Sequence, residues 1–191
     1  MVEHVLKTGV TLVIRPAVPN DAENFVQYLE AIAAQSDFLT FGPGEIDSVE
    51  TQHKSIRDFG DEKNGIFLLA EVEGRIVGGL TFRRGKRPKT AHTGEFGISI
   101  LQDYWGLGIG RIMIGRLLDW AVQTGKIRKI NLRVRTDNLR GIALYKKMGF
   151  TVEGCITRDL CSNGVLYDVY TMGLNIDAEQ PVKGNALILL K

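Results

Sequence analysis

Hydrophobic and polar residues follow two different periods along this chain, and these periods divide it into strand-like and helix-like segments. β-Branched runs and alternating apolar positions predict strands at residues 11–15, 66–72, 75–82, 93–100, 129–134, 152–157 and 167–174. Helical spacing predicts helices after Asn20, after Asp47 or Ser48, from Gly108 to about Thr124 and from Asn138 to Met148. Glu23 stands three residues after Asn20, the spacing of a capping box at the start of the first helix.

The connections between these segments indicate how they are joined. Only Glu73 and Gly74 separate the second and third predicted strands, which predicts a tight hairpin. No repeat, low-complexity block or linker divides the chain. We therefore expect one mixed α/β domain over residues 1–174, followed by a C-terminal tail at residues 175–191.

The overall composition narrows the class of protein. The chain has 191 residues, of which 44% are hydrophobic and 24% charged, as in an ordinary globular protein. Its 24 basic and 22 acidic residues leave a net charge of +2, too little to attract nucleic acid or an anionic membrane by a general field. The N-terminus lacks a signal-peptide pattern, and no apolar stretch is long enough to cross a bilayer. We expect a cytoplasmic protein.

Cysteines and histidines are few and scattered. A disulfide between Cys155 and Cys161 is conceivable across a hairpin, but two reduced cysteines are favoured in a cytoplasmic protein. With His4, His53 and His92 they show no spacing typical of metal ligands, so we expect no metal.

A glycine-rich turn, Trp105-Gly106-Leu107-Gly108-Ile109-Gly110-Arg111, lies between the fourth predicted strand and a predicted helix. Glycines at alternate positions allow the backbone to come close to a ligand. The first turn of the following helix has unsatisfied N–H groups and a partial positive charge. Together these features predict a cradle for a pyrophosphate.

The spacing of the turn argues against two nucleotide-binding motifs. A Walker loop ends in Gly-Lys-Ser/Thr, whereas Gly110 is followed by Arg111 and Ile112. A dinucleotide fold places G-x-G-x-x-G after the first strand, whereas this G-x-G-x-G turn lies in the middle of the chain. A glycine turn without any ligand stays open at this point.

A second motif, Asn138-Leu139-Arg140-Gly141-Ile142-Ala143-Leu144-Tyr145-Lys146-Lys147-Met148-Gly149-Phe150, follows one helix and one strand later. With the glycine turn it resembles the GNAT superfamily of N-acetyltransferases over roughly residues 10–174. The resemblance implies an α/β fold with a mixed, mostly antiparallel central sheet, flanked by helices and splayed at the acyl-CoA site. Trp105 departs from the family's Arg/Gln at that position. Tyr104-Trp105-Gly106 looks like the subgroup that includes ribosomal-protein N-terminal and some small-amine acetyltransferases.

The resemblance also implies a cofactor site. Its residues are Ile98, Ser99, Ile100, Gly106, Leu107, Gly108, Ile109, Gly110, Arg111 and Asn138, with acetyl-CoA as co-substrate. The backbone at 98–100 pairs with the pantetheine arm like an added strand, and the amides at 107–111 hold the pyrophosphate. Asn138 contacts the pantetheine or stabilises its loop, and the role of a helix N-cap is compatible with either.

Two residues are implied to be catalytic. Tyr145 matches the family tyrosine that protonates the departing thiolate, and its alternative is a packed helix tyrosine. Glu95, eleven positions before Gly106, matches the suspected general base of the subgroup, often acting through water; its alternative is an ion-paired edge residue. Ser36, Ser99 and Ser162 show no nucleophile–base pattern, so we expect direct transfer in a ternary complex.

The acceptor is less defined by the sequence. We expect a primary amine, on a small molecule, a protein N-terminus or a lysine, to bind near the first two helices, residues 37–45 and residues 159–168. Phe38 and Glu45 suit a cationic amine, although surface acids are usually only solvated. The basic loop at 83–89 is expected on the same side. A homodimer, a catalytically silent acyl-CoA sensor and a nucleic-acid or ribosome-associated module remain alternatives, although the near-neutral charge disfavours the last.

Overall fold

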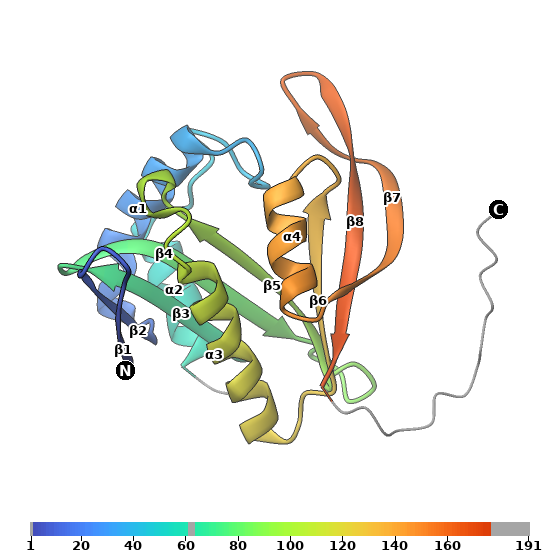
Figure 1. Ribbon diagram of the computed structural model, residues 1–191, viewed down its shortest axis with the longest axis horizontal. Helices are drawn as coiled ribbons and strands as arrows, with labels where there is room; N and C mark the ends of the chain where they lie inside the picture. The colour runs from blue at the N-terminus through green and yellow to red at the C-terminus, as the bar shows by residue number, and fades with distance from the viewer. Residues whose placement is uncertain (1, 61–63, 177–191) are drawn as a thin grey trace.

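The computed structural model describes residues 2–60 and 64–176, which form one open sheet with helices on both faces (Figure 1). The strands are β1 (Val2–Val5), β2 (Thr11–Pro16), β3 (Gly65–Val72), β4 (Arg75–Arg84), β5 (Thr93–Ile100), β6 (Lys129–Arg135), β7 (Thr151–Ser162) and β8 (Val165–Asn175). The helices are α1 (Ala22–Gln35), α2 (Val49–Phe59), α3 (Ile109–Thr124) and α4 (Leu139–Lys147), with short 3-10 turns at Pro19–Asp21 and Gln102–Tyr104. The predicted tail lies almost wholly outside the described residues.

The strand order is β1-β2-β3-β4-β5-β6-β8-β7, and every neighbouring pair is antiparallel except β5 with β6. The predicted mixed, mostly antiparallel sheet is therefore confirmed. The β3–β4 hairpin turns at Glu73 and Gly74, both with positive φ, as the sequence predicts.

Helices cover both faces of the sheet. The rings of Phe25 and Tyr28 from α1 lie against Gly79 of β4. On the opposite face, Trp120 of α3 meets Phe82 of β4 edge-on. α4 packs beside α3 on this second face, and α2 lies beside α1 on the first (Figure 1).

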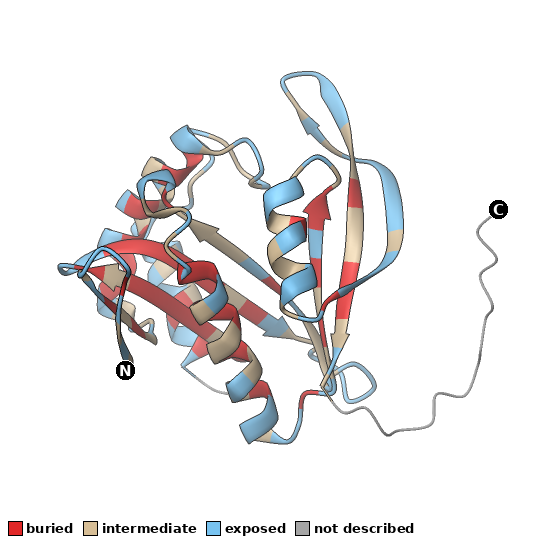
Figure 2. Ribbon diagram, viewed as in Figure 1, coloured by how far each residue is buried: buried red, intermediate tan, exposed pale blue. Residues whose placement is uncertain are grey.

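Burial concentrates in the middle of the sheet and decreases toward the β7–β8 hairpin (Figure 2). β3 and β4 consist mostly of buried residues, because both of their faces are covered. β7 is almost entirely exposed. Its polar, irregular sequence explains why the two predicted final strands are shorter than the observed hairpin.

The predicted capping box at Asn20 is wrong. Residues Pro19–Asp21 form a 3-10 turn and α1 begins at Ala22. The carboxylate of Asp21 accepts hydrogen bonds from Arg15 and from the backbone N–H of Val18 instead. The ion pair between Asp21 and Arg15 of β2 therefore holds the turn that precedes this helix.

Candidate functional site

The sheet opens where β5 leaves β6. Their parallel pairing covers only Thr93–Glu95 of β5 against Lys129–Asn131 of β6. From Gly97 to Ile100, β5 pairs with β4 alone. One backbone edge of this stretch has no strand beside it, which leaves hydrogen-bonding groups for an extended ligand.

The glycine turn lies at the end of that free edge. Gly106 and Gly108 have φ values of +78° and +87°, and a Cβ at either would meet no atom within 4 Å apart from those of its chain neighbours. The turn therefore has a left-handed backbone facing open space, a conformation that favours glycine.

Six consecutive backbone amides of the turn are free. Within the described residues, no N–H group from Gly106 to Arg111 donates a hydrogen bond, and the first such bond of α3 runs from Ile112 to the carbonyl of Gly108. These amides precede or open a helix of 16 residues, whose N-terminal dipole adds positive potential. The arrangement can bind a phosphate group without a side-chain cation.

Gly110, the third glycine, has a different reason to be glycine. A Cβ there would lie 2.9 Å from Cδ2 of Leu144 and 3.4 Å from Cδ1 of Ile100. The absence of a side chain thus lets α3 approach α4 and β5 closely, and the three elements meet at the turn.

Trp105 fixes the start of the turn. Its indole N–H donates to the carbonyl of Ile100 at 2.6 Å. The guanidinium of Arg140, from the first turn of α4, lies 4.2 Å from the centre of its ring. The family has Arg or Gln at the position of Trp105. In this chain Arg140 of α4 places a positive charge next to that tryptophan instead. Arg111 is exposed and forms no ion pair within the described residues.

The side chains of residues 98–100 alternate between the two faces of β5. The Ser99 hydroxyl shares a hydrogen bond of 2.7 Å with the hydroxyl of Tyr28 on α1. Burial raises the pKa of Tyr28 above its ordinary value. Ile98 and Ile100 are half-buried and pack against the core.

Asn138 caps α4. Its side-chain oxygen accepts a hydrogen bond of 2.9 Å from the N–H of Gly141. The predicted N-cap role is confirmed, while contact with a pantetheine stays a prediction.

Tyr145 lies in an aromatic cluster beside the opening of the sheet. Its ring stands edge-on to Phe96 at 5.9 Å and to Phe150 at 6.4 Å between centroids. Its hydroxyl makes no hydrogen bond within the described residues. Burial raises the pKa of Tyr145 to about 12. The phenol therefore keeps its proton at neutral pH, the form in which it can donate to a thiolate.

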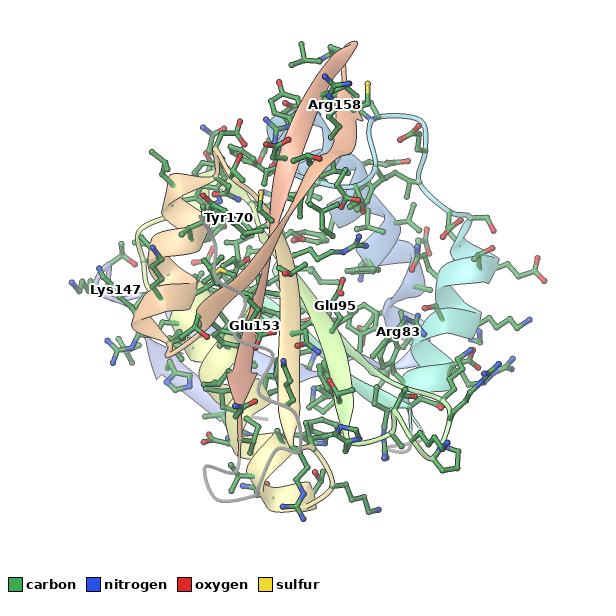
Figure 3. All side chains as sticks on the ribbon, turned by 90° about the vertical axis from the view of Figure 1, so that its right-hand side faces the viewer. Arg83, Glu95, Lys147, Glu153, Arg158 and Tyr170 are labelled. Atoms are coloured by element: carbon green, nitrogen blue, oxygen red, sulfur yellow. The ribbon has the colours of Figure 1, made fainter. Side chains whose placement is uncertain are left out.

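Glu95 is the last β5 residue paired with β6, and its side chain is 52% exposed. Nε of Arg133 on β6 donates to Glu95 at 3.3 Å, and Nη1 of the same arginine donates to Asp159 of β7 at 3.3 Å. Figure 3 shows Glu95 on the face of the sheet that also presents Arg83. Glu95 is thus ion-paired, which was the alternative that the sequence left open. Its role as a general base stays a prediction.

The structure brings the predicted residues together around one strand but on two faces. Phe96, which contacts Tyr145, and Ile100, which contacts the glycine turn, point to the α3–α4 face. Ser99 points to the α1 face, as its bond to Tyr28 shows. Glu95 points to the same face, because successive side chains of a strand alternate between its two faces and Glu95 lies four residues before Ser99 in β5. A reaction between the two candidate catalytic groups would take place across the free edge of β5.

Sequence reasoning missed the partners of the predicted residues. Tyr28, Arg133 and Arg140 each contact a predicted residue from another element. Nothing local marks Tyr28 or Arg133, since their partners are distant in sequence. Arg140 could have been predicted from the sequence. Trp105 replaces the family's Arg or Gln, and a nearby cation would compensate for that replacement.

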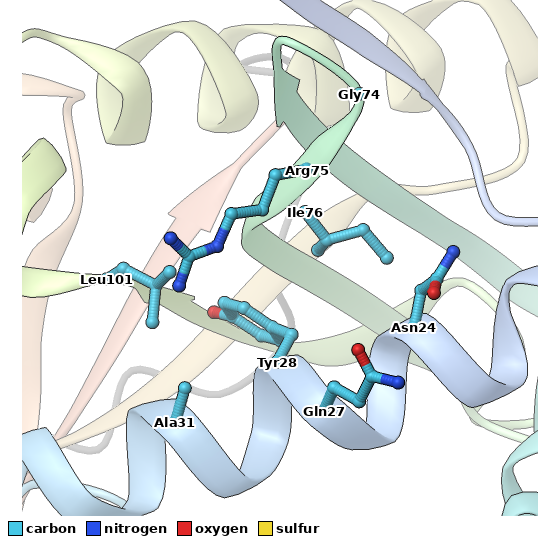
Figure 4. Close-up of a pocket in the computed structure, with 8 residues that line it drawn as sticks. All are labelled: Asn24, Gln27, Tyr28, Ala31, Gly74, Arg75, Ile76 and Leu101. Carbon is cyan, nitrogen blue, oxygen red and sulfur yellow. The ribbon is translucent and has the colours of Figure 1, made fainter.

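A separate hollow of about 290 Å³ lies between α1 and the start of β4 (Figure 4). Tyr28, Arg75 and Leu101 are among its lining residues, and no predicted catalytic or cofactor residue is. It borders the predicted site, because Tyr28 is hydrogen-bonded to Ser99 and Leu101 directly follows Ile100.

Other predictions concern metals, cysteines and membranes. Cys155 and Cys161 are both free and exposed, so no disulfide joins them. Within residues 2–60 and 64–176, no group of three or more metal-ligating side chains is present. None of the helices in that part of the chain has the length and apolar character needed to cross a membrane.

Comparison with known proteins assigns the chain to a family. The model of the acetyltransferase (GNAT) family matches residues 28–150, and the chain belongs to this family. The matched region contains the glycine turn, the free edge of β5 and Tyr145.

Individual relatives agree with this assignment. The chain is 30% identical to the L-amino acid N-acetyltransferase AaaT of Escherichia coli over 55% of this chain and 65% of that protein, just under two thirds of its length. A GNAT acetyltransferase structure from Streptococcus pneumoniae superposes with a TM-score of 0.83 at 31% identity, covering 87% of this chain and 99% of the other. The structure of yncA from Salmonella typhimurium, solved with its cofactor acetyl-CoA, has the same fold, with a TM-score of 0.78 at 19% identity over 89% and 96% of the two chains.

Proposed function

We propose that this chain is an N-acetyltransferase that moves the acetyl group of acetyl-CoA directly to a primary amine in a ternary complex. The observation that carries the proposal is the run of six free amides from Gly106 to Arg111 at the end of the free β5 edge. An extended arm ending in a pyrophosphate fits both features at once. The family assignment and the acetyl-CoA complex of yncA support the same donor.

Each part of the donor has a matching part of the chain. The backbone at Ile98, Ser99 and Ile100 would pair with the amide-containing pantetheine arm. The amides of Gly106, Leu107, Gly108, Ile109, Gly110 and Arg111 would hold the pyrophosphate, with Arg140 adding positive charge beside Trp105. Asn138 holds the start of α4 next to them.

The reaction then needs two proton transfers. The amine nitrogen attacks the thioester carbonyl carbon, the carbon–sulfur bond breaks, and the amine loses a proton. Glu95 accepts that proton, through water, from the α1 face. The Tyr145 hydroxyl gives its proton to the departing thiolate from the α4 face, which leaves the acetylated amine and the free thiol.

The acceptor class is proposed more broadly. The name of the Escherichia coli relative makes L-amino acids the first amines to test. Polyamines, peptides with a free N-terminus and lysine side chains follow, because acidic and aromatic residues both lie in the loop after α1. A cytoplasmic location stays a prediction.

A thiol-release assay tests the function. The chain is incubated with acetyl-CoA and each amine of this panel, and free thiol is measured with the acetylated product confirmed by mass spectrometry. We expect release that depends on one amine class. Tight binding of acetyl-CoA without transfer to any amine would contradict the proposal and favour the silent sensor.

A further inference from the structure

Arg135 is a buried arginine that the proposed chemistry does not use. It is the last residue of β6 and is 5% exposed. Together with Asp21 it makes up the buried polar or charged residues of the described chain. Because burying a guanidinium is costly unless it is fully paired, its partners indicate what it does.

Two carboxylates on different segments bind this guanidinium. Asp137, in the connection to α4, accepts from Nε at 3.0 Å and from Nη2 at 2.7 Å. Asp37, in the loop that follows α1, accepts from Nη1 through its side chain at 2.9 Å and through its backbone carbonyl at 2.7 Å. The arginine therefore joins the α1–α2 loop to the end of β6.

Aromatic contacts extend this junction to the β7–β8 hairpin. The guanidinium lies 3.5 Å from the ring centre of Tyr167 on β8 and 4.9 Å from that of Phe38. The hydroxyl of Ser162, at the end of β7, donates to the other carboxylate oxygen of Asp37. The Ser162 hydroxyl, and after it Arg135, hold the pKa of Asp37 below its usual value, so Asp37 is ionised at neutral pH.

The position of the junction in the sheet gives it a role. β5 and β6 are paired only at Thr93–Glu95 and separate toward the end of β6, where Arg135 lies. α1, which leads into Asp37, is fixed to β5 by the Tyr28–Ser99 hydrogen bond. Arg135 thus connects the two halves of the sheet across the open end of the splay. In Figure 1 the loop after α1 reaches over the opening to the top of β6 and α4.

We propose that Arg135 is a positioning residue for the acceptor amine, holding the loop after α1, with Phe38, and the β7–β8 hairpin as the walls of the acceptor entrance. This inference rests on the proposed function. The loop belongs to the α1 face, which also presents Glu95, whereas the free amides belong to the N-terminus of α3. Loss of the junction therefore changes acceptor binding and leaves acetyl-CoA binding intact.

The test compares Arg135→Lys with Arg15→Lys. Arg15 is a matched control, because it also binds two carboxylates, Asp21 and Glu71, but lies on β2. Lysine keeps the charge and loses the fork that reaches two carboxylates. We expect Arg135→Lys to raise the KM for the amine about tenfold or more, with the KM for acetyl-CoA within about twofold of the parent. Arg15→Lys should leave both KM values unchanged.

Amide hydrogen exchange supplies a readout that does not need an acceptor. We expect Arg135→Lys to accelerate exchange at residues 37–45 and 163–167, and Arg15→Lys not to. Asp37→Asn, at an exposed side chain, repeats the test if Arg135→Lys does not fold. If the parent accepts no amine, the proposed function fails while the exchange result still tests the junction. Unchanged exchange, or faster exchange with an unchanged acceptor KM, would overturn the inference.

Discussion

The ring of Tyr145 stands edge-on to that of Phe96, with 5.9 Å between their centroids. Phe96 is the β5 residue directly after Glu95, where β5 leaves β6. The tyrosine of α4 is therefore placed at the point where the sheet opens, next to the free edge expected to hold the thioester.

This placement makes Tyr145→Phe a sensitive test of proton donation. We expect kcat to fall about 100-fold or more, because the thiolate loses its donor. The dissociation constant of acetyl-CoA should stay within about twofold, and the melting temperature should change little, since the hydroxyl makes no hydrogen bond in the described residues. Steady-state kinetics and calorimetry measure these values. An unchanged kcat would remove Tyr145 from the mechanism.

Glu95→Gln tests the candidate base. We expect a loss of kcat on the order of tenfold to 1,000-fold, with acetyl-CoA affinity retained. Glu153→Gln is a matched control, because Glu153 is also a strand glutamate in an ion pair, with Lys129 at 2.8 Å, and its side chain is 38% exposed. Equal effects of the two substitutions would assign Glu95 a structural role only.

Gly108→Ala tests the turn. The substitution forces a side chain into φ +87° and places a methyl group on the face where the amides are free. We expect acetyl-CoA affinity to fall about tenfold or more and stability to fall by about 1–2 kcal/mol. Gly125→Ala is the control, since Gly125 ends the same helix with φ +61° and open space around it. It should lose similar stability and bind acetyl-CoA normally; weaker binding by both variants would show that strain alone explains the effect.

The raised pKa of Tyr145 predicts a loss of stability in alkali. Its pKa is about 12 in the folded chain and about 10 when unfolded, so the unfolded state releases the proton first as the pH rises. The contribution, about 3 kcal/mol for a shift of about two pKa units, is complete below pH 10 and is lost between about pH 10 and 12. Urea unfolding at several pH values measures it. In Tyr145→Phe the free energy of unfolding should fall less steeply with pH above pH 10. A pH dependence identical to that of the parent would contradict the raised pKa of Tyr145.

Local patterns predicted a large part of the fold and the position of the glycine turn, while the role of that turn in binding a cofactor stays a prediction. The bounds of β5, the Glu73-Gly74 turn, the glycine turn and the Asn138 cap all depend on residues close together in sequence. Their physical causes are equally local: alternation, positive φ and unsatisfied helix amides.

What the sequence did not reveal depends on distant partners. Arg15 binds Asp21 and also Glu71, which is 56 positions away, and α1 begins at Ala22 rather than directly after Asn20. Arg135 meets Asp37 from 98 positions away, and no period or motif marks that pair. The acceptor entrance that we propose depends on such contacts, which explains why it was the least predictable part.

The short pairing between β5 and β6 has a consequence for how this chain can change. Three residue pairs join two strand ladders that are otherwise built separately. Side chains also join them: Arg133 of β6 donates to Glu95 of β5, and Arg135 of β6 binds Asp37 in the loop after α1. Substitutions at such positions can adjust the width of the opening while both ladders keep their hydrogen bonds. New acceptor preferences can therefore arise by small relative shifts of two intact halves.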